Sequence, residues 1–289
     1  MAEAGYFVYA GARKQADLDA LNAIDNIMAV RLDVTKQEEI DAAVELVESE
    51  GRGLWGLVNN AGVNHIDPLI EFEDWTMDFV FDVNVFGVVR VTKAFAPLII
   101  ESQGRIVNIS SISGVLAGGL TGYGFYFMSK HAIEAFSDQL SWELMKFGVR
   151  VAAVEPGNFA SSIGTTRCNR MLSERDDRNY QFYAEEMNEY YDGCAEWLAE
   201  GGVSESPPPV MVADAIQHAL FAASPREHYL VVADPFEARI TIGKLVEELV
   251  HMNEGHDQTY SREELIEMLD GEEARFRGDI PPGMPGIYE

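Results

Sequence analysis

Through about residue 155, short runs of β-branched and apolar residues alternate with longer amphipathic stretches, and this rhythm constrains the fold more than any other feature. Each short run has the composition of a strand, and each longer stretch repeats its apolar residues with the period of a helix. Strands and helices in alternation form βαβ units, whose strands lie parallel in one sheet. The sequence therefore predicts an α/β fold with a doubly wound parallel sheet. The strand-like runs include YFVYAG, IMAVRLDV, LWGLVNNAG, RIVNI and RVAAVEP.

The pattern changes over residues 159–209, a polar segment that carries several aromatic residues and ends in three prolines. Two interpretations fit this segment: a substrate loop placed after the carboxyl end of a strand, or aromatic residues that pack a peripheral pair of helices. We expect one domain over residues 1–235 and a C-terminal helical extension over 236–289. The last helix should begin at the capping box that Ser261 and Glu264 form.

Composition excludes several classes of function. The chain has 289 residues, with 48 acidic against 21 basic side chains and a net charge of −27, so a nucleic acid partner is not expected. We find no run of about 20 apolar residues and no signal peptide at the start, so we expect no membrane span and a cytoplasmic protein. Cys168 and Cys194 lie outside any metal-binding spacing, and we expect inert thiols with neither a disulfide nor a bound metal.

Tyr126 and Lys130 are four residues apart in a predicted helix, so their side chains share one face. A lysine beside a phenol favours the phenolate and lowers its pKa, which suits an acid/base tyrosine. The pair alone is weak evidence. Polar residues and glycines also close three successive predicted strands and should converge where open α/β sheets bind ligands. These closing segments are Asn59–Gly62, Asn108–Ser111 and Glu155–Gly157.

The blocks LDVT, LVNNAG, DVNVFG, GRIVNISS, YFMSK and VEPGNF, in this order, resemble the short-chain dehydrogenase/reductase family over about residues 5–235. The segment after YFMSK is most similar to the branch of retinol, hydroxysteroid and D-3-hydroxybutyrate dehydrogenases. The resemblance implies a Rossmann-type fold and a homodimer or homotetramer. It also implies hydride transfer between NAD or NADP and a primary or secondary alcohol or carbonyl, with a lipophilic sterol, retinoid or hydroxy acid as the small-molecule substrate.

By matching position, the resemblance makes Tyr126 the general acid/base and Lys130 the group that lowers its pKa and holds the nicotinamide ribose. Ser111 would donate a hydrogen bond to the reacting oxygen, with Ser113 as the alternative, and Asn84 would hold a water in the proton relay. The implied cofactor contacts beyond Tyr126 and Lys130 are Asp33 and Val34 at the adenine, Asn60, Ala61 and Gly62 at the ribose, and Pro156, Gly157 and Ser161 at the nicotinamide.

After the first visible strand the chain has no carboxylate where an NAD-preferring member of the family would bind the ribose hydroxyls. Arg13 stands there instead and can grip a 2′-phosphate, so NADP is favoured over NAD. We do not find the family's first strand and its glycine-rich turn in this sequence. The chain opens on MAEAG, which resembles the last turn of a helix with Gly5 at its end. We expect that Met1 is an internal methionine of a longer chain. Because the family places the missing strand at the centre of the sheet, we also expect the first two visible strands to be separated from the others.

Two other functions remain open. A non-catalytic or cofactor-impaired homologue agrees with the absent glycine-rich turn, whereas the complete set of Asn84, Ser111, Tyr126 and Lys130 argues against it. A sugar-nucleotide epimerase or dehydratase also uses Tyr-x-x-x-Lys, but the NNAG block and the modest C-terminal region argue against that class.

Overall fold

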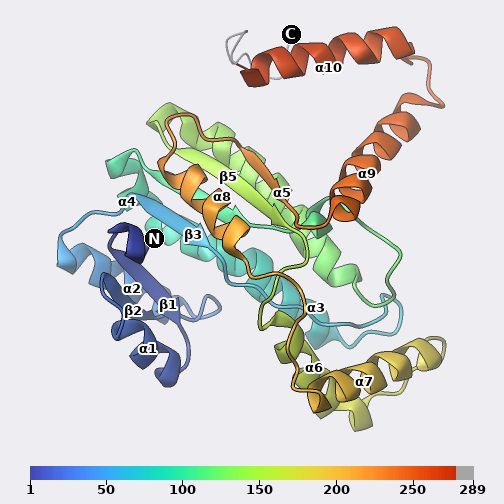
Figure 1. Ribbon diagram of the computed structural model, residues 1–289, viewed down its shortest axis with the longest axis horizontal. Coiled ribbons are helices and arrows are strands. Elements are labelled where there is room, and N and C mark those ends of the chain that lie inside the picture. The colour runs from blue at the N-terminus through green and yellow to red at the C-terminus, as the bar shows by residue number, and fades with distance from the viewer. Residues whose placement is uncertain (278–289) are drawn as a thin grey trace. The chain divides into compact units, whose positions relative to one another are not determined.

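The computed structural model describes residues 1–277, which contain six strands in parallel pairs (Figure 1). The strands form two sheets, one with the order β1-β2 and one with the order β3-β4-β5-β6. The prediction that the first two visible strands stand apart from the others is therefore confirmed. The strands are β1 (Val8–Ala12), β2 (Ile27–Arg31), β3 (Gly56–Asn59), β4 (Arg105–Ile109), β5 (Arg150–Pro156) and β6 (His228–Val231).

Ten α-helices connect and follow the strands within these residues. Most begin after a strand, as βαβ units require. They are α1 (Gln15–Asn22), α2 (Gln37–Glu50), α3 (Asp74–Phe81), α4 (Val88–Ser102), α5 (Gly124–Leu144), α6 (Ile163–Glu174), α7 (Ala184–Ala199), α8 (Val210–Phe221), α9 (Pro235–Asn253) and α10 (Arg262–Arg277). Shorter turns are η1 (Ala2–Ala4), the π-helical η2 (Asp82–Gly87), η3 (Ile112–Gly114), η4 (Met145–Phe147) and η5 (Arg175–Asp177).

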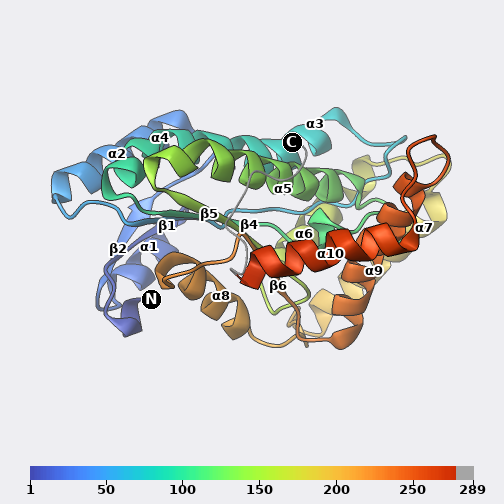
Figure 2. The same cartoon turned by 90° about the horizontal axis from the view of Figure 1, so that it is seen from above.

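Helices cover both faces of the four-stranded sheet, with α4 and α5 on one face and α8 on the other (Figure 2). Val107 and Val154 are buried between strands and α8, and Ile106 and Val151 are buried on the opposite face beneath α4 and α5. Nearly continuous apolar strands follow from burial on both faces of a parallel sheet. The doubly wound Rossmann-type fold predicted from the sequence is confirmed.

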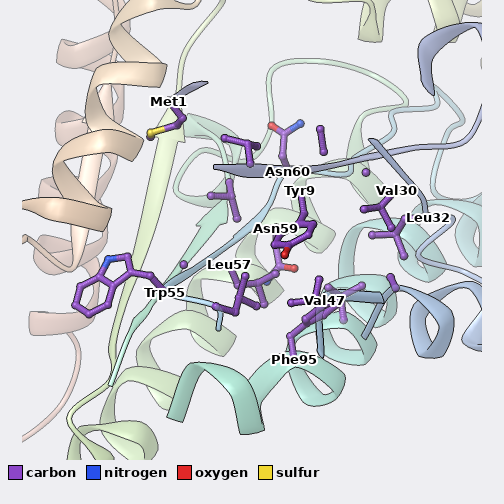
Figure 3. A pocket seen from close by; sticks show the side chains of 18 of the residues that line it. Met1, Tyr9, Val30, Leu32, Val47, Trp55, Leu57, Asn59, Asn60 and Phe95 are labelled. Atoms are coloured by element: carbon purple, nitrogen blue, oxygen red, sulfur yellow. The ribbon is translucent and has the colours of Figure 1, made fainter. Parts of the chain in front are cut away.

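A cavity of about 610 Å³ separates β1 from β3 (Figure 3). Residues of both strands line it, together with apolar side chains of α2 and α4 such as Val47 and Phe95. Along this slot the facing edges of β1 and β3 have no strand partner among residues 1–277. Three residues of the predicted cofactor site, Val34, Asn60 and Ala61, also line the cavity.

Residues Asp74–Ser102 form a helical run that is long and apolar enough to cross a membrane, with a mean hydropathy of 1.6 in its most apolar window. The sequence predicts a long amphipathic segment here, from about Trp75 to Ile100, and no membrane span. In the structure Val80, Val91 and Ile99 of the run are buried in the core of the fold. These burials are those of an interior helix of an α/β domain, so the run is weak evidence for a membrane span.

The chain divides into two compact units, Met1–Thr241 and the residues from Ile242 onward. The predicted boundary between 235 and 236 falls in the first turn of α9. In the second unit, Ser261 and Glu264 form the predicted capping box: the Glu264 carboxylate accepts from the Ser261 amide at 2.7 Å, and the Glu264 amide donates to the Ser261 hydroxyl at 3.3 Å. Gly5 closes η1 in the left-handed conformation with φ 87°, as expected for a helix end.

Candidate active site

Buried amides fix the carboxyl ends of β3 and β4 relative to the helices above them. The Asn59 amide donates to Asn108 Oδ1 at 2.8 Å and to Thr92 of α4 at 2.9 Å. Asn108 in turn donates to Ser137 of α5 at 2.9 Å. Because buried amides need such partners, this network holds α4, α5 and two strand ends in one register.

Tyr126 and Lys130 lie on the first two turns of α5, where the helix passes over these strand ends. Lys130 Nζ is 5.6 Å from the centroid of the Tyr126 ring and donates to the Ile109 carbonyl at 2.9 Å. Lys130 is 6% exposed, and burial lowers its pKa to about 8, against the opposing charge of Glu134. An ammonium group has three donors, so Lys130 retains hydrogen-bonding capacity beyond Ile109.

The pKa of Tyr126 is raised, and this differs from the depression expected from a neighbouring lysine. Burial is the main cause, and a hydrogen bond with the Ser111 side chain opposes it. The Lys130 ammonium lies 5.6 Å from the ring centroid and donates to the Ile109 carbonyl. In this arrangement Tyr126 is a protonated donor at neutral pH.

Ser111, rather than the alternative Ser113, contacts the Tyr126 phenol. Ser111 is the N-cap residue of η3, and its hydroxyl accepts from the Ser113 amide at 3.1 Å. The same hydroxyl donates to the Pro156 carbonyl at 3.4 Å, which links it to the end of β5. The side chain of Ser111 is therefore positioned between β4, β5 and the start of α5.

Asn84 lies in the π-helical turn η2 between α3 and α4 and is 1% exposed. Its Oδ1 accepts from the Val63 amide at 2.8 Å, while its Nδ2 donates to the Val63 carbonyl at 2.9 Å and to Ser129 at 3.0 Å. A methyl group on Gly62 would lie 3.6 Å from Asn84 Oδ1 and 3.8 Å from Lys130 Nζ. Single π-turns are frequent at functional sites, and this one brings Asn84 beside Gly62 and Lys130.

Arg13 and Asp33 follow β1 and β2 at the other end of the predicted cofactor site. Asp33 Oδ1 accepts from the Thr35 hydroxyl at 2.7 Å and from the Thr35 amide at 3.1 Å. Its pKa is lowered: burial would raise it, but the Thr35 hydrogen bonds and the nearby Arg13 charge outweigh burial. Arg13 itself is exposed, so its guanidinium is accessible to an anion beside Asp33.

The loop after β5 carries Pro156, Gly157 and Ser161. The Gly157 amide donates to the Val231 carbonyl of β6 at 2.8 Å, and a side chain at this position would collide with the carboxylate of Glu237. Ser161 is exposed and accepts from the Ile163 amide at 3.4 Å at the start of α6. Of the three, Gly157 is therefore held most firmly in its backbone position.

Glu237 is a residue that the sequence interpretation missed. It lies in the first turn of α9 and is 6% exposed. Its Oε1 accepts from the Asn158 amide at 3.0 Å and from the Asn158 side chain at 2.5 Å. Glu237 thereby orders the backbone next to Gly157. Sequence alone gave no signal, because an acidic residue in a first helical turn is usually explained by the helix dipole.

Two carboxylates of the loop after β3 tether the segment that leads into α7. Asp67 is fully buried; it pairs with Arg178 and accepts from the Thr76 hydroxyl at 2.8 Å. Glu71 accepts hydrogen bonds from three successive backbone amides, Gln181 at 2.5 Å, Phe182 at 3.0 Å and Tyr183 at 2.9 Å. Most of residues 159–209 form the packed helix pair α6–α7, and the role of the segment as a substrate loop stays a prediction.

The expectation of two inert thiols is wrong: Cys168 of α6 and Cys194 of α7 form a disulfide. Both residues are buried among aromatic side chains, including Tyr191. Their Cα atoms lie 5.1 Å apart, a separation typical of disulfides, although 26 residues separate them in the sequence. Sequence spacing could not reveal the pairing, because it depends on how α6 and α7 pack. Disulfides are rare in cytosolic proteins, so the cytoplasmic location stays a prediction that this bond does not favour.

His228, at the start of β6, contacts three acidic side chains. Its Nδ1 lies 2.8 Å from Glu155, its Nε2 lies 2.9 Å from Asp138, and Glu134 is 3.5 Å away. These hydrogen bonds raise the pKa of His228 to about 12. The protonated imidazole therefore supplies the positive charge that this acidic group requires, where a metal ion could otherwise have been considered.

The residues present fit a nicotinamide dinucleotide at the strand ends. A side chain at Gly62 would contact Asn84 and the Lys130 ammonium, a side chain at Gly157 would collide with Glu237, and Arg13 offers an exposed cation at the far end. A parallel α/β sheet with polar residues converging at its carboxyl edge defines the class of dinucleotide-binding folds.

The chain belongs to the short chain dehydrogenase family, whose sequence profile matches residues 1–171. It is 38% identical over 250 residues to the mitochondrial D-beta-hydroxybutyrate dehydrogenase of Bos taurus, covering 78% of this chain and 69% of that protein. It is 39% identical over 215 residues to the human 17-beta-hydroxysteroid dehydrogenase type 6, covering 71% and 65%. Retinol dehydrogenase 7 of Mus musculus is 36% identical over 222 residues, with the same coverages. The family and branch inferred from the sequence motifs are thus confirmed.

The chain therefore spans about two thirds of the length of these relatives. Among solved structures, a short-chain dehydrogenase of Streptomyces avermitilis superimposes with a TM-score of 0.68 at 27% identity, covering 87% of each chain. A short chain dehydrogenase of Burkholderia cenocepacia, solved in complex with NADP, superimposes with a TM-score of 0.60 at 21% identity, covering 84% of this chain and 83% of that one. The second likeness supports the fold alone.

Proposed function

We propose that the protein is an NAD(P)-dependent oxidoreductase that moves hydride between the nicotinamide and a carbinol or carbonyl carbon of a small molecule. One observation carries this proposal: the half-buried Tyr126 phenol is hydrogen-bonded to Ser111, and the ammonium of the buried Lys130 lies 5.6 Å from its ring centroid on the same helix face. The dehydrogenase names of the relatives agree with it.

The bound cofactor would supply or accept the hydride, and the protein would manage the proton. Ser111 would hold the substrate oxygen by a hydrogen bond. Tyr126 would exchange the proton with that oxygen, and the positive charge of Lys130 would stabilise the phenolate that accepts the proton in alcohol oxidation and forms again in carbonyl reduction.

The remaining site residues would position the partners. Lys130 has donors left for the nicotinamide ribose, and a glycine at position 62 would let the ribose approach the ammonium without meeting a side chain. Asn84 would hold the loop that carries Gly62 and Val63 in place. Arg13 would pair with a 2′-phosphate, which favours NADP over NAD.

The test is a panel of primary and secondary alcohols, with their ketones and aldehydes, assayed with both cofactors by the absorbance of reduced nicotinamide. Tyr126→Phe removes the proton donor and little volume, so it should reduce turnover by at least about tenfold while cofactor affinity is unchanged. Retention of more than about a tenth of the wild-type rate would remove Tyr126 from the mechanism.

A cofactor-impaired binding homologue is the second candidate, and the divided sheet favours it. Arg13 and Asp33 follow the two-stranded sheet, whereas Asn60 and Gly62 follow the four-stranded one, with the slot between β1 and β3 separating them. Isothermal titration with NADPH distinguishes the two functions, because this homologue would show no cofactor binding.

A further inference from the structure

Arg167 of α6 contacts the N-terminal end of α5, close to the candidate acid/base residue. Its Nη1 donates to the Tyr123 hydroxyl at 2.8 Å, and its guanidinium lies 5.7 Å from the centroid of the Tyr123 ring. Tyr123 precedes Tyr126 by three residues and, after burial, is one of the groups that raise the pKa of Tyr126. Arg167 therefore places a positive charge at the Tyr123 hydroxyl, one helical turn before the phenol that would exchange the substrate's proton.

This charge has no carboxylate partner in the part of the chain that the structure describes. Arg178 pairs with Asp67, and Arg175 pairs with Asp192 at 2.9 Å. Arg167 forms no such pair, and its Nε is buried without any hydrogen-bond partner. Burying part of a guanidinium unpaired is costly. An arginine without a carboxylate partner is also unexpected in a chain with 48 acidic residues.

Both charged signs surround the buried His65 near Arg167: three arginines lie there together with the carboxylates of Asp67 and Glu174. His65, which is 2% exposed, feels the charges of Arg167, Arg170 and Arg178. Burial lowers the pKa of His65 to about 4; the charge of Asp67 opposes this shift, and the three arginines add to it. His65 is therefore neutral at pH 7, and its Nδ1 is buried without a partner. A small anion entering this region would find unused donors.

We propose that Arg167 binds the carboxylate of the substrate, and that the substrate is a short hydroxy acid rather than a sterol or retinoid. This inference rests on the proposed oxidoreductase function. The planar guanidinium matches a carboxylate in a two-point contact. Tyr123 and Tyr126 are three residues apart, and the Cβ atoms of such residues on a helix lie about 5–6 Å apart. A carboxylate bound by Arg167 beside Tyr123 would therefore place a carbinol a few bonds away near Tyr126. An uncharged sterol or retinoid would bury the guanidinium without pairing it.

The chemistry leaves the carboxylate unchanged. In the oxidation, the C–H bond of the carbinol carbon breaks and its hydride passes to the oxidised nicotinamide. The O–H proton passes to the Tyr126 phenolate, and the carbinol becomes a keto group. Arg167 takes no part in bond breaking, so it is a specificity-determining residue.

The test compares 3-hydroxybutanoate with its methyl ester, which share the carbinol and differ in charge. Arg167→Met should lower kcat/KM for the acid by about 10- to 150-fold, the range for a charge-assisted hydrogen bond, and change the ester by less than about threefold. Arg167→Lys should retain part of the preference for the acid. The matched control is Arg175→Met at the end of the same helical segment, where the guanidinium is already paired with Asp192 at 2.9 Å. It should leave the acid-to-ester ratio unchanged.

Calorimetric titration of 3-hydroxybutanoate into Tyr126→Phe protein, with and without Arg167→Met, separates this inference from the proposed function. Acid binding that disappears with Arg167→Met supports the inference even when no alcohol is oxidised, and in that case only the proposed function fails. Equal losses for acid and ester, acid binding that is independent of Arg167, or a wild-type preference for the ester would overturn it. Thermal melts of each variant show whether a loss of acid binding comes from unfolding. If Arg167→Met unfolds, the acid-to-ester preference of Arg167→Lys decides whether the inference holds.

Discussion

Breaking the disulfide between Cys168 and Cys194 should destabilise the α6–α7 pair. The bond closes a loop with a sequence separation of 26 residues. Loop-closure entropy for that length corresponds to about 3.5 kcal/mol at 25 °C. For a unit of 241 residues, each kcal/mol shifts the Tm by roughly 2–4 °C, so the double variant Cys168→Ala/Cys194→Ala should melt roughly 7–14 °C lower if the whole unit unfolds together.

The assay pairs thermal melts with thiol counting in denaturant. Wild-type protein should show no free thiol until it is reduced, and reductant should lower its Tm toward that of the double variant. The double variant is its own control, because reductant should not change its melt. Two titratable thiols in the unreduced, denatured wild type would refute the bond, and a wild-type Tm that is unaffected by reductant would refute the stabilisation.

Three further changes test other parts of the structure. Arg13→Ala should raise the KM for NADPH far more than for NADH, by a factor equivalent to ~1–3 kcal/mol, and equal effects would refute the phosphate contact. Lys130→Ala should weaken cofactor binding in calorimetry as well as turnover; a fall in turnover alone would contradict its role at the ribose. Since burial lowers the pKa of His65 from 6.5 to about 4, the unfolded chain binds a proton first as the pH falls, and stability should be lost between these values by at most ~3 kcal/mol. Melts of His65→Gln across this range should show a flatter profile than wild type, and parallel profiles would contradict this.

Much of the fold could be predicted because its signals are local. The predicted strand RIVNI coincides with β4, and the predicted helix that carries Tyr126 and Lys130 is α5. Apolar periodicity and strand composition determine such elements without tertiary information. The separation of β1 and β2 from the other strands followed from a family resemblance and not from the residues themselves.

The features that the sequence did not reveal depend on side chains far apart in the chain. Glu237 contacts Asn158, which lies 79 residues earlier, and the two cysteines meet only because α6 and α7 pack together. The raised pKa of Tyr126 was also missed, because spacing placed Lys130 on the right face but could not show that its ammonium turns toward Ile109. Burial and hydrogen-bond partners determine such pKa values, and both are tertiary properties.

The Glu71 carboxylate has a consequence for the order in which the protein folds. It accepts hydrogen bonds from three backbone amides directly before α7, which are 110 to 112 residues away in the sequence. Contacts of this separation are slow to form, because loop-closure entropy must be overcome before they contribute any stability. We therefore expect α7 to become ordered late, after β3 and its following loop are in place. By the same reasoning the segment around residues 178–183 should open first in the native protein, and its amides should exchange with solvent deuterium sooner than those of β4 and β5.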